Sequence, residues 1–352
     1  MSLRWRRSSP QPDESLQLVR LPKHDYAPQQ NAVRVDPRGI GALSIHLENL
    51  ELTRSIAQEA SSLTYSTLAA AIDIGLSMLE TQHGRRSLRQ ELGRQWKGAG
   101  PRSNKAYVDH FLRRIRHDFP WVVVERMSPN VIVAARRLDR LTKGSEDSPK
   151  RFGLYFNYYG VTAMVHSCGQ APTSRTMRQR FHTYLFKFAC AIAHEVCTLL
   201  VSHSHNHLSK AVVVSASHTR TGFDNMLFGG HLKFYANEGV DGNHPGVPHV
   251  LDERGVSHQV DPDYVRSVVL EREYTFPLQV TGRSYTAHDR ATLRLQNMGA
   301  LGAGYPPPSD ELLMEALSER HLRVYDVSES DLRRIPHRLG PLKKAVTVVY
   351  VR

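Results

Sequence analysis

The stretch Ala193-His194-Glu195-Val196-Cys197-Thr198 lies near the C-terminal end of a long apolar run. A His-Glu pair on a buried helix opens a zinc-hydrolase signature, in which a second histidine one turn later completes the metal-binding pair. Thr198 occupies that position here. The sequence therefore predicts the frame of a metallopeptidase site with one ligand replaced. The site is then inactive, rebuilt with other ligands, or purely structural.

The residues around this pair predict one long helix that begins after Ser174, its expected N-cap, and runs to about Ser202. Apolar side chains fill two opposite sides of this helix, which is typical of a helix buried within a domain. The polar side chains fall together in one stripe: Lys187, His194, Glu195, Thr198 and Ser202. A buried polar stripe costs free energy unless its groups are hydrogen-bonded or coordinate a ligand. A structural His-Glu-Lys network and a metal site are both open interpretations.

Composition limits the class of protein. A chain of 352 residues with 40% hydrophobic content can hold one large or two ordinary domains. Its three cysteines do not make a disulfide framework, which favours an intracellular location in the nucleus or cytoplasm. The basic N-terminus leaves a mitochondrial presequence as an alternative, although Asp13 and Glu14 weaken it. No apolar run approaches the roughly 20 residues that span a bilayer, so no membrane partner is expected.

We expect an α+β protein in four segments. Scattered prolines indicate a flexible, basic N-terminal segment over residues 1–44. Residues 45–142 form a helical, basic region with a hairpin, and residues 143–150 have the composition of a linker. Residues 151–352 form an α+β domain, because Phe152–Tyr159 and Val161–Ser167 are rich in aromatic and β-branched residues typical of strands.

The basic region suggests an anionic partner. The net charge is +12, and ten basic residues against only two acidic ones lie between Arg85 and Arg116. Three predicted helices precede two strand-like runs, Trp121–Glu125 and Val131–Ala135, in the order of a winged helix. Nucleic acid would then be contacted by basic residues of the third helix: Lys105, Arg113, Arg114 and Arg116. The alternative is a plain helical subdomain whose arginines face water.

Two further segments accompany the His-Glu helix. Thr221-Gly222-Phe223-Asp224 follows it, and Leu227-Phe228-Gly229-Gly230 then leads into the apolar run ending at Tyr235. This layout, over residues 150–240, resembles a group of uncharacterised fungal proteins with a zincin-like core. Those proteins carry a His-Glu-x-x-His helix, a Gly-Glu-x-Gly-Arg-like segment and a Leu-Phe-Gly-Gly turn before a strand.

The resemblance implies a zinc-dependent peptidase fold acting on a peptide substrate. It makes His194 a zinc ligand and Glu195 the base that activates water. No acidic residue matches the Glu-x-Gly frame, so Asp224 is the nearest acidic candidate for a third ligand and His218 a weaker one. Because Thr198 replaces the second histidine, we expect a degenerate metallopeptidase-like protein without strong proteolytic activity. The alternatives are a basic protein that binds nucleic acid through the Arg85–Arg140 region and an interaction scaffold that binds no ligand.

Overall fold

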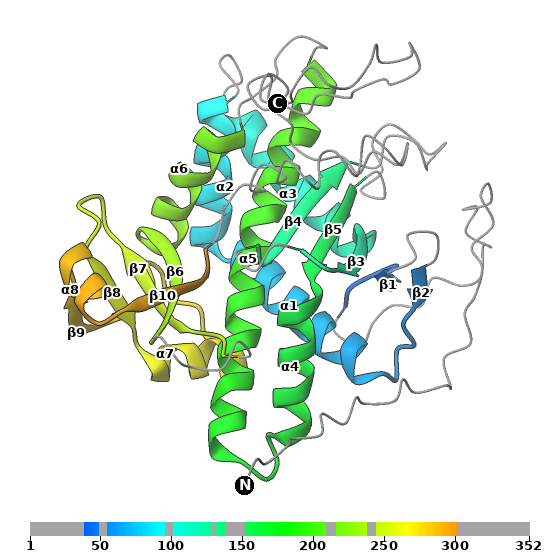
Figure 1. Ribbon diagram of the computed structural model, residues 1–352. Coiled ribbons are helices and arrows are strands. Elements are labelled where there is room, and N and C mark those ends of the chain that lie inside the picture. The colour runs from blue at the N-terminus through cyan, green and yellow to red at the C-terminus, as the bar shows by residue number, and fades with distance from the viewer. Residues whose placement is uncertain are drawn as a thin grey trace, which may run out of the picture.

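The computed structural model describes residues 39–48, 55–95, 101–127, 131–137, 152–208, 216–237 and 244–300. This part of the chain contains helices and the strands of two β-sheets, so the predicted α+β class is confirmed. A long helix, α5 (Arg175–Leu208), runs through the centre with one sheet on each side of it (Figure 1). Most of the predicted N-terminal segment and the whole predicted linker lie outside the described residues.

The first sheet has five strands in the order β2–β1–β3–β5–β4. Their bounds are β1 Ile45–Glu48, β2 Ser55–Ala57, β3 Trp121–Glu125, β4 Val133–Arg137 and β5 Phe152–Asn157. The three inner strands, β1, β3 and β5, are parallel, whereas β2 and β4 run antiparallel along the edges. The inner strands are largely buried and rich in apolar residues, as parallel strands usually are.

The predicted hairpin between Trp121–Glu125 and Val131–Ala135 is wrong. β5 lies between β3 and β4, and Leu154 of β5 is in register with Val122 on one side and Ala135 on the other. Pairing of this kind buries Val122 and Leu154 completely, which a two-stranded hairpin would not do. The helix and hairpin order of a winged helix is therefore not present among the described residues. Since β5 follows residue 150, this sheet also joins the two segments that the sequence divides at residues 143–150.

Three helices, α1 (Leu63–Glu80), α2 (Gln82–Gln95) and α3 (Pro101–His117), precede β3. Three helices are predicted in this region, but the first begins later than its apolar pattern suggests, since Leu47 and Ile56 lie in strands β1 and β2. The side chain of Ser62 accepts a hydrogen bond from the Tyr65 amide and caps α1. The apolar face predicted for the third helix is largely buried: Val108, Phe111, Leu112 and Ile115.

The strand predicted over Val161–Ser167 is also wrong, because these residues lie in helix α4 (Tyr158–Gln170). The Asn157 side chain accepts a hydrogen bond from the Tyr159 amide and starts the helix directly after β5. The buried residues of α4 include Val161, Met164 and Ser167, and this spacing of three is helical rather than alternating. Local β-propensity is thus overridden by the cap and by packing.

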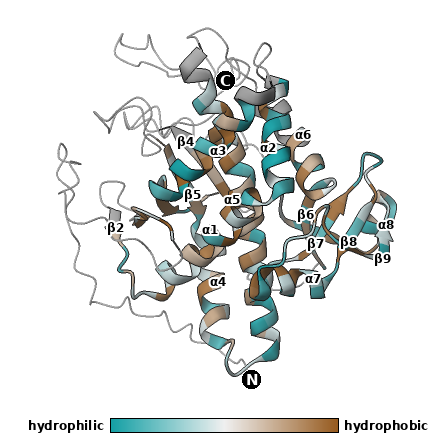
Figure 2. Cartoon of the chain, turned by 180° about the vertical axis from the view of Figure 1, so that it is seen from behind, coloured by the Kyte–Doolittle hydropathy of each residue, from teal (hydrophilic) through white to brown (hydrophobic). Residues whose placement is uncertain are grey.

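Helix α5 begins after Ser174, whose hydroxyl accepts a hydrogen bond from the Met177 amide as predicted. It is apolar where it passes between the sheets and more hydrophilic toward its N-terminal end (Figure 2). Its Arg175–Ser204 part is the one described helix that is long and apolar enough to cross a membrane. However, 89% of its most apolar window is buried inside the molecule, as in the core helix of a globular domain. Most of this helix therefore belongs to the core.

The second sheet is antiparallel and has the order β10–β6–β7–β8–β9. Its strands are β6 His231–Asn237, β7 Val247–Leu251, β8 Ser257–Val260, β9 Val280–Tyr285 and β10 Leu295–Ala300. The accompanying helices are α6 Ala216–Phe228, α7 Pro262–Arg266, the π-helix η2 Ser267–Glu271, and α8 Ala287–Thr292. Helix α5 separates this sheet from the first one, so residues on its different sides meet different sheets (Figure 1).

Candidate functional site

His194 and Glu195 lie in the buried middle of α5, with 2% and 4% of their surfaces exposed. Successive residues of a helix point about 100° apart, so the two side chains leave the helix in different directions. His194 contacts α6, next to the second sheet, whereas Glu195 contacts β4 of the first sheet. The pair therefore does not converge on one point.

Glu195 is hydrogen-bonded to the backbone of the first sheet. Its Oε2 atom accepts a hydrogen bond of 2.9 Å from the Ala135 amide. Among the described strands, β4 lies at an edge, so the amides on its outer side are not paired with a further strand. A buried amide of this kind requires an acceptor. The predicted catalytic base thus has a structural partner in the folded protein.

His194 and Asp224 form a buried contact between α5 and α6. The Nδ1 atom of His194 lies 2.7 Å from Oδ1 of Asp224, a carboxylate with no exposed surface. The Nδ1 atom of His231, at the start of β6, lies 3.5 Å from the other carboxylate oxygen. We call His194, Asp224 and His231 the Asp224 cluster. The sequence suggests His194 and Asp224 as zinc ligands, and in the structure their side chains contact each other.

The electrostatics of the Asp224 cluster favour an ionised carboxylate. Burial by itself would raise the pKa of Asp224. The neighbouring His194 acts in the opposite direction through its charge and its hydrogen bond, and His231 adds to this effect. The net result is a pKa below the ordinary value of an aspartate.

His231 reaches the cluster because of the Gly229-Gly230 turn between α6 and β6. Both glycines have positive φ angles, +85° and +156°, which other residues rarely adopt. A Cβ atom at Gly230 would lie 2.3 Å from the carbonyl oxygen of Leu251. Sequence analysis did not select His231 as a site residue, although its place directly after the two glycines was the available signal.

The predicted zinc ligands are His194, Asp224 and, as a weaker candidate, His218. In the part of the chain that the structure describes, no group of three or more His, Cys, Asp or Glu side chains could hold a metal ion. His194 and Asp224 contact each other directly through Nδ1 and Oδ1. His218 lies in α6 six residues before Asp224, about 9 Å away along the helix axis, and its side chain is outside the described residues. The described residues therefore do not assemble the predicted zinc ligands.

Lys187, the third charged residue of the polar stripe, is also bonded away from the His-Glu pair. Its Nζ donates to the carbonyl oxygens of Pro245, at 3.1 Å, and Met298, and it lies 5.1 Å from the centre of the Phe234 ring. Burial lowers the pKa of Lys187 to about 7. The contacts of His194, Glu195 and Lys187 thus go to separate neighbouring elements, and they do not form the single His-Glu-Lys network that was one of the two interpretations.

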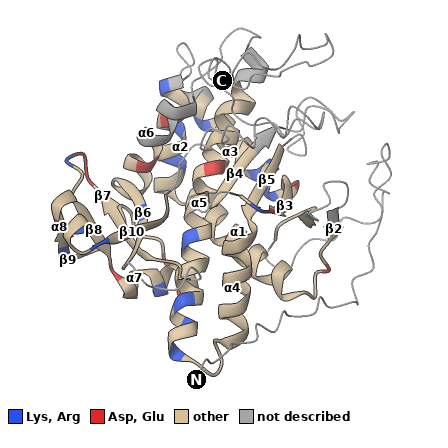
Figure 3. Ribbon diagram, viewed as in Figure 1, with Lys and Arg blue, Asp and Glu red and all other residues tan. Residues whose placement is uncertain are grey.

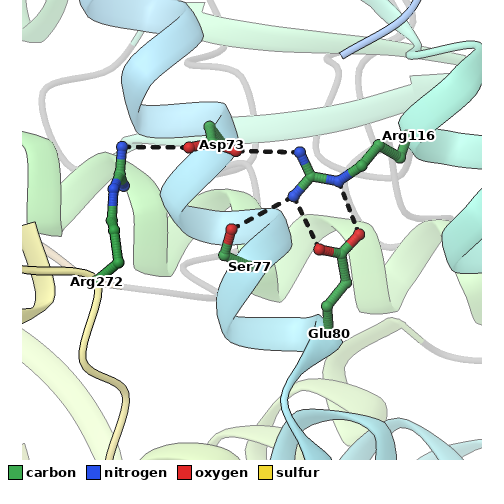
Figure 4. Close-up of polar contacts among 5 residues, drawn as sticks. All are labelled: Asp73, Ser77, Glu80, Arg116 and Arg272. Atoms are coloured by element: carbon green, nitrogen blue, oxygen red, sulfur yellow. Dashed lines mark hydrogen bonds and ion pairs between the residues drawn. The ribbon is translucent and has the colours of Figure 1, made fainter. Parts of the chain in front are cut away.

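The predicted nucleic-acid contacts of α3 differ in their surroundings. Lys105 and Arg113 are exposed, and Arg114 is half-buried. Arg116 instead donates to both carboxylate oxygens of Glu80, at 2.7 and 2.9 Å, and to Asp73 at 3.0 Å (Figure 4). The prediction that Arg116 faces a nucleic-acid backbone is wrong, because its guanidinium is held by two carboxylates of α1.

Comparison of the chain with family models, with curated proteins and with solved structures gives no match. The function is therefore inferred from the geometry of these residues alone.

Proposed function

We propose that this protein is a metallopeptidase-like scaffold without proteolytic activity, in which His194 and Glu195 stabilise the fold. The observation that carries the proposal is the divergence of the two side chains, one toward Asp224 and one toward the Ala135 amide. In a zinc peptidase the glutamate must lie within hydrogen-bond reach of the water bound to the metal that the histidine holds. The replacement of the second histidine by Thr198 supports the same conclusion.

Peptide hydrolysis tests this proposal. The full chain, incubated with zinc, is assayed against a mixture of fluorogenic peptides beside the variant Glu195→Gln. Glutamine keeps a side-chain oxygen that can accept the Ala135 hydrogen bond, so this variant should remain folded. We expect no turnover by either protein. Zinc-dependent turnover by the wild type that is lost in the folded variant would contradict the proposal and restore Glu195 as a catalytic base.

A second proposed function is the binding of an anionic partner such as nucleic acid by α3. It is supported by the exposure of Lys105 and Arg113, neither of which has a carboxylate partner among the described residues. The variant Lys105→Gln/Arg113→Gln should weaken binding of a duplex oligonucleotide, and the affinity of the wild type should fall steeply with salt. Arg116 is left intact in this test because it belongs to the ion pairs with α1. Equal affinity of the variant and the wild type would exclude this surface.

A further inference from the structure

A cavity of about 650 Å³ lies at the N-terminal part of α5, away from the Asp224 cluster. Its walls come from the first turns of α5, the segment His244–Pro248, the end of β8 and the helix α7. Basic residues mark the N-terminal part of α5 and the region of α7 (Figure 3). The volume is within the range of about 300–1,000 Å³ that is usual for small-molecule sites.

The charged residues that line this cavity are mostly of one sign. Arg175, Arg178 and Arg180 come from α5 and Arg266 comes from α7, whereas Asp263 is the one acidic residue among the lining residues. Within the described ranges, no carboxylate forms an ion pair with Arg175, Arg178 or Arg266. Arg178 donates only to the backbone carbonyls of the preceding turn. Arg175, Arg178 and Arg266, from two elements, therefore line a shared space with an excess of positive charge.

His182, which also lines the cavity, is within the electrostatic influence of two of these arginines. Burial lowers the pKa of its imidazole, and the charges of Arg178 and Arg266 lower it further. Both arginines therefore act on the same lining residue, although they belong to different helices. A concentrated positive potential within a concave, partly apolar wall attracts anions strongly.

Accessible apolar side chains also line the cavity, beside polar ones such as Gln179 and Gln259. Leu270 has 51% of its surface exposed, Pro262 is exposed and Val247 is half-buried. Apolar side chains can pack against the organic part of a ligand, whereas they make no favourable contact with a bare inorganic ion. The site thus combines a cationic side with a hydrophobic side.

We propose that this cavity binds a small organic phosphate of nucleotide size. Its phosphate groups are held by Arg175, Arg178 and Arg266, and its organic part packs against Val247, Pro262 and Leu270. Planar guanidinium groups match phosphate oxygens through paired hydrogen bonds. A nucleic-acid strand would instead require an extended basic groove that follows its backbone. The inference does not depend on the fate of the His194–Glu195 pair.

Isothermal titration calorimetry of the full chain with ATP tests the site, with inorganic pyrophosphate and a single-stranded oligonucleotide as comparison probes. We expect one ATP per chain and weaker binding of pyrophosphate, which lacks the organic part. The variant Arg175→Gln/Arg266→Gln removes one exposed cation from each helix. It should weaken ATP binding by about a hundredfold, since a hydrogen bond to a charged group contributes about tenfold or more.

The matched control is Arg254→Gln/Arg283→Gln, which removes the same charge from exposed positions that do not line the cavity. This control should bind ATP as the wild type does. The proposal is overturned if ATP does not bind, or if the two double variants lose the same affinity, because the effect would then reflect net charge. Binding of the oligonucleotide without binding of ATP would also overturn it, and would identify a nucleic-acid surface instead.

Discussion

At Asp224, burial and two histidine neighbours act in opposite directions on the pKa of one carboxyl group, and the histidines prevail. A carboxyl whose pKa is lower in the folded than in the unfolded state stabilises the fold at pH values above the unfolded pKa. This contribution is lost as the pH falls through the folded pKa. The Asp224 cluster is therefore an acid-sensitive element of stability as well as a link between α5, α6 and β6.

Replacing Asp224 by asparagine should reduce the free energy of unfolding at pH 7 by about 1.5–3 kcal/mol, the usual contribution of a hydrogen bond to a charged group. The variant should also lose less stability than the wild type between pH 5 and pH 3. Urea unfolding at a series of pH values measures both effects. Asp252→Asn is the control, because Asp252 also has a lowered pKa but is on the surface. Equal stability of Asp224→Asn and the wild type would contradict the role of the cluster.

Lys187 predicts a pH dependence of the same sign as Asp224, but in a neutral to alkaline window. Burial lowers its folded pKa to about 7, whereas an unfolded lysine titrates near 10.5. Between these values the unfolded state binds more protons, so this residue makes the free energy of unfolding rise with pH. The variant Lys187→Met should lack that rise between pH 7 and pH 10. If chemical denaturation gives parallel pH profiles for the two proteins, Lys187 is not a buried titrating group.

At the level of elements, Arg116 joins three parts of the fold. It connects α3 to Asp73 and Glu80 of α1, and the second carboxylate oxygen of Asp73 lies 3.2 Å from Arg272 after η2 (Figure 4). Burial would lower the pKa of Arg116, but the hydrogen bonds and charges of Glu80 and Asp73 raise it above its ordinary value. The network therefore holds a permanently charged guanidinium between two helices.

Arg116→Gln should reduce the free energy of unfolding by about 1.5–3 kcal/mol, because hydrogen bonds to charged groups are lost. Arg113→Gln, on the same helix, is the matched control and should change stability by less than about 0.5 kcal/mol, as exposed substitutions usually do. Thermal and urea unfolding compare the two variants. Similar effects of both substitutions would show that the contacts of Arg116 carry no special stabilisation.

The elements also show what the sequence can predict. The apolar faces of α3 and α5 and the Ser174 cap follow from periodicity and local hydrogen bonding, which a short window of sequence contains. The pairing of β3 with β5 does not follow from local sequence. Leu154 lies about thirty residues from Val122 and pairs with it only when the sheet forms. Similarly, the β-branched residues of α4 look like a strand until the Asn157 cap and the packing of Met164 are known.

For the candidate site, sequence analysis found His194, Glu195 and Asp224 but not their relation. The hydrogen-bonding role of Glu195 depends on the position of β4 at the sheet edge, because the Ala135 amide there requires an acceptor. His231 and Arg266 of α7 come from distant segments, so no spacing rule connects them to α5. Long-range packing, rather than residue type, decides the chemistry here.

At the scale of the whole molecule, the first sheet and α5 make residues 45–208 interdependent. β3 pairs with β5, and α1 packs against the buried face of α5. A fragment that ends at residue 142 lacks both β5 and α5. The apolar side chains that these two elements bury in the full chain would then be exposed to solvent. We expect this fragment to show no cooperative thermal unfolding by circular dichroism. A cooperative transition like that of the full chain would indicate an independent N-terminal domain.

Zinc content of the purified, untagged full chain tests most directly the claim that the His-Glu helix stabilises the fold and does not catalyse. Elemental analysis after incubation with zinc and removal of the excess should find far less than one zinc per chain, while His194→Ala should be markedly less stable than the wild type. One zinc per wild-type chain that is absent from a folded His194→Ala variant would contradict the account. His194 would then be a metal ligand, with His218 as a candidate partner.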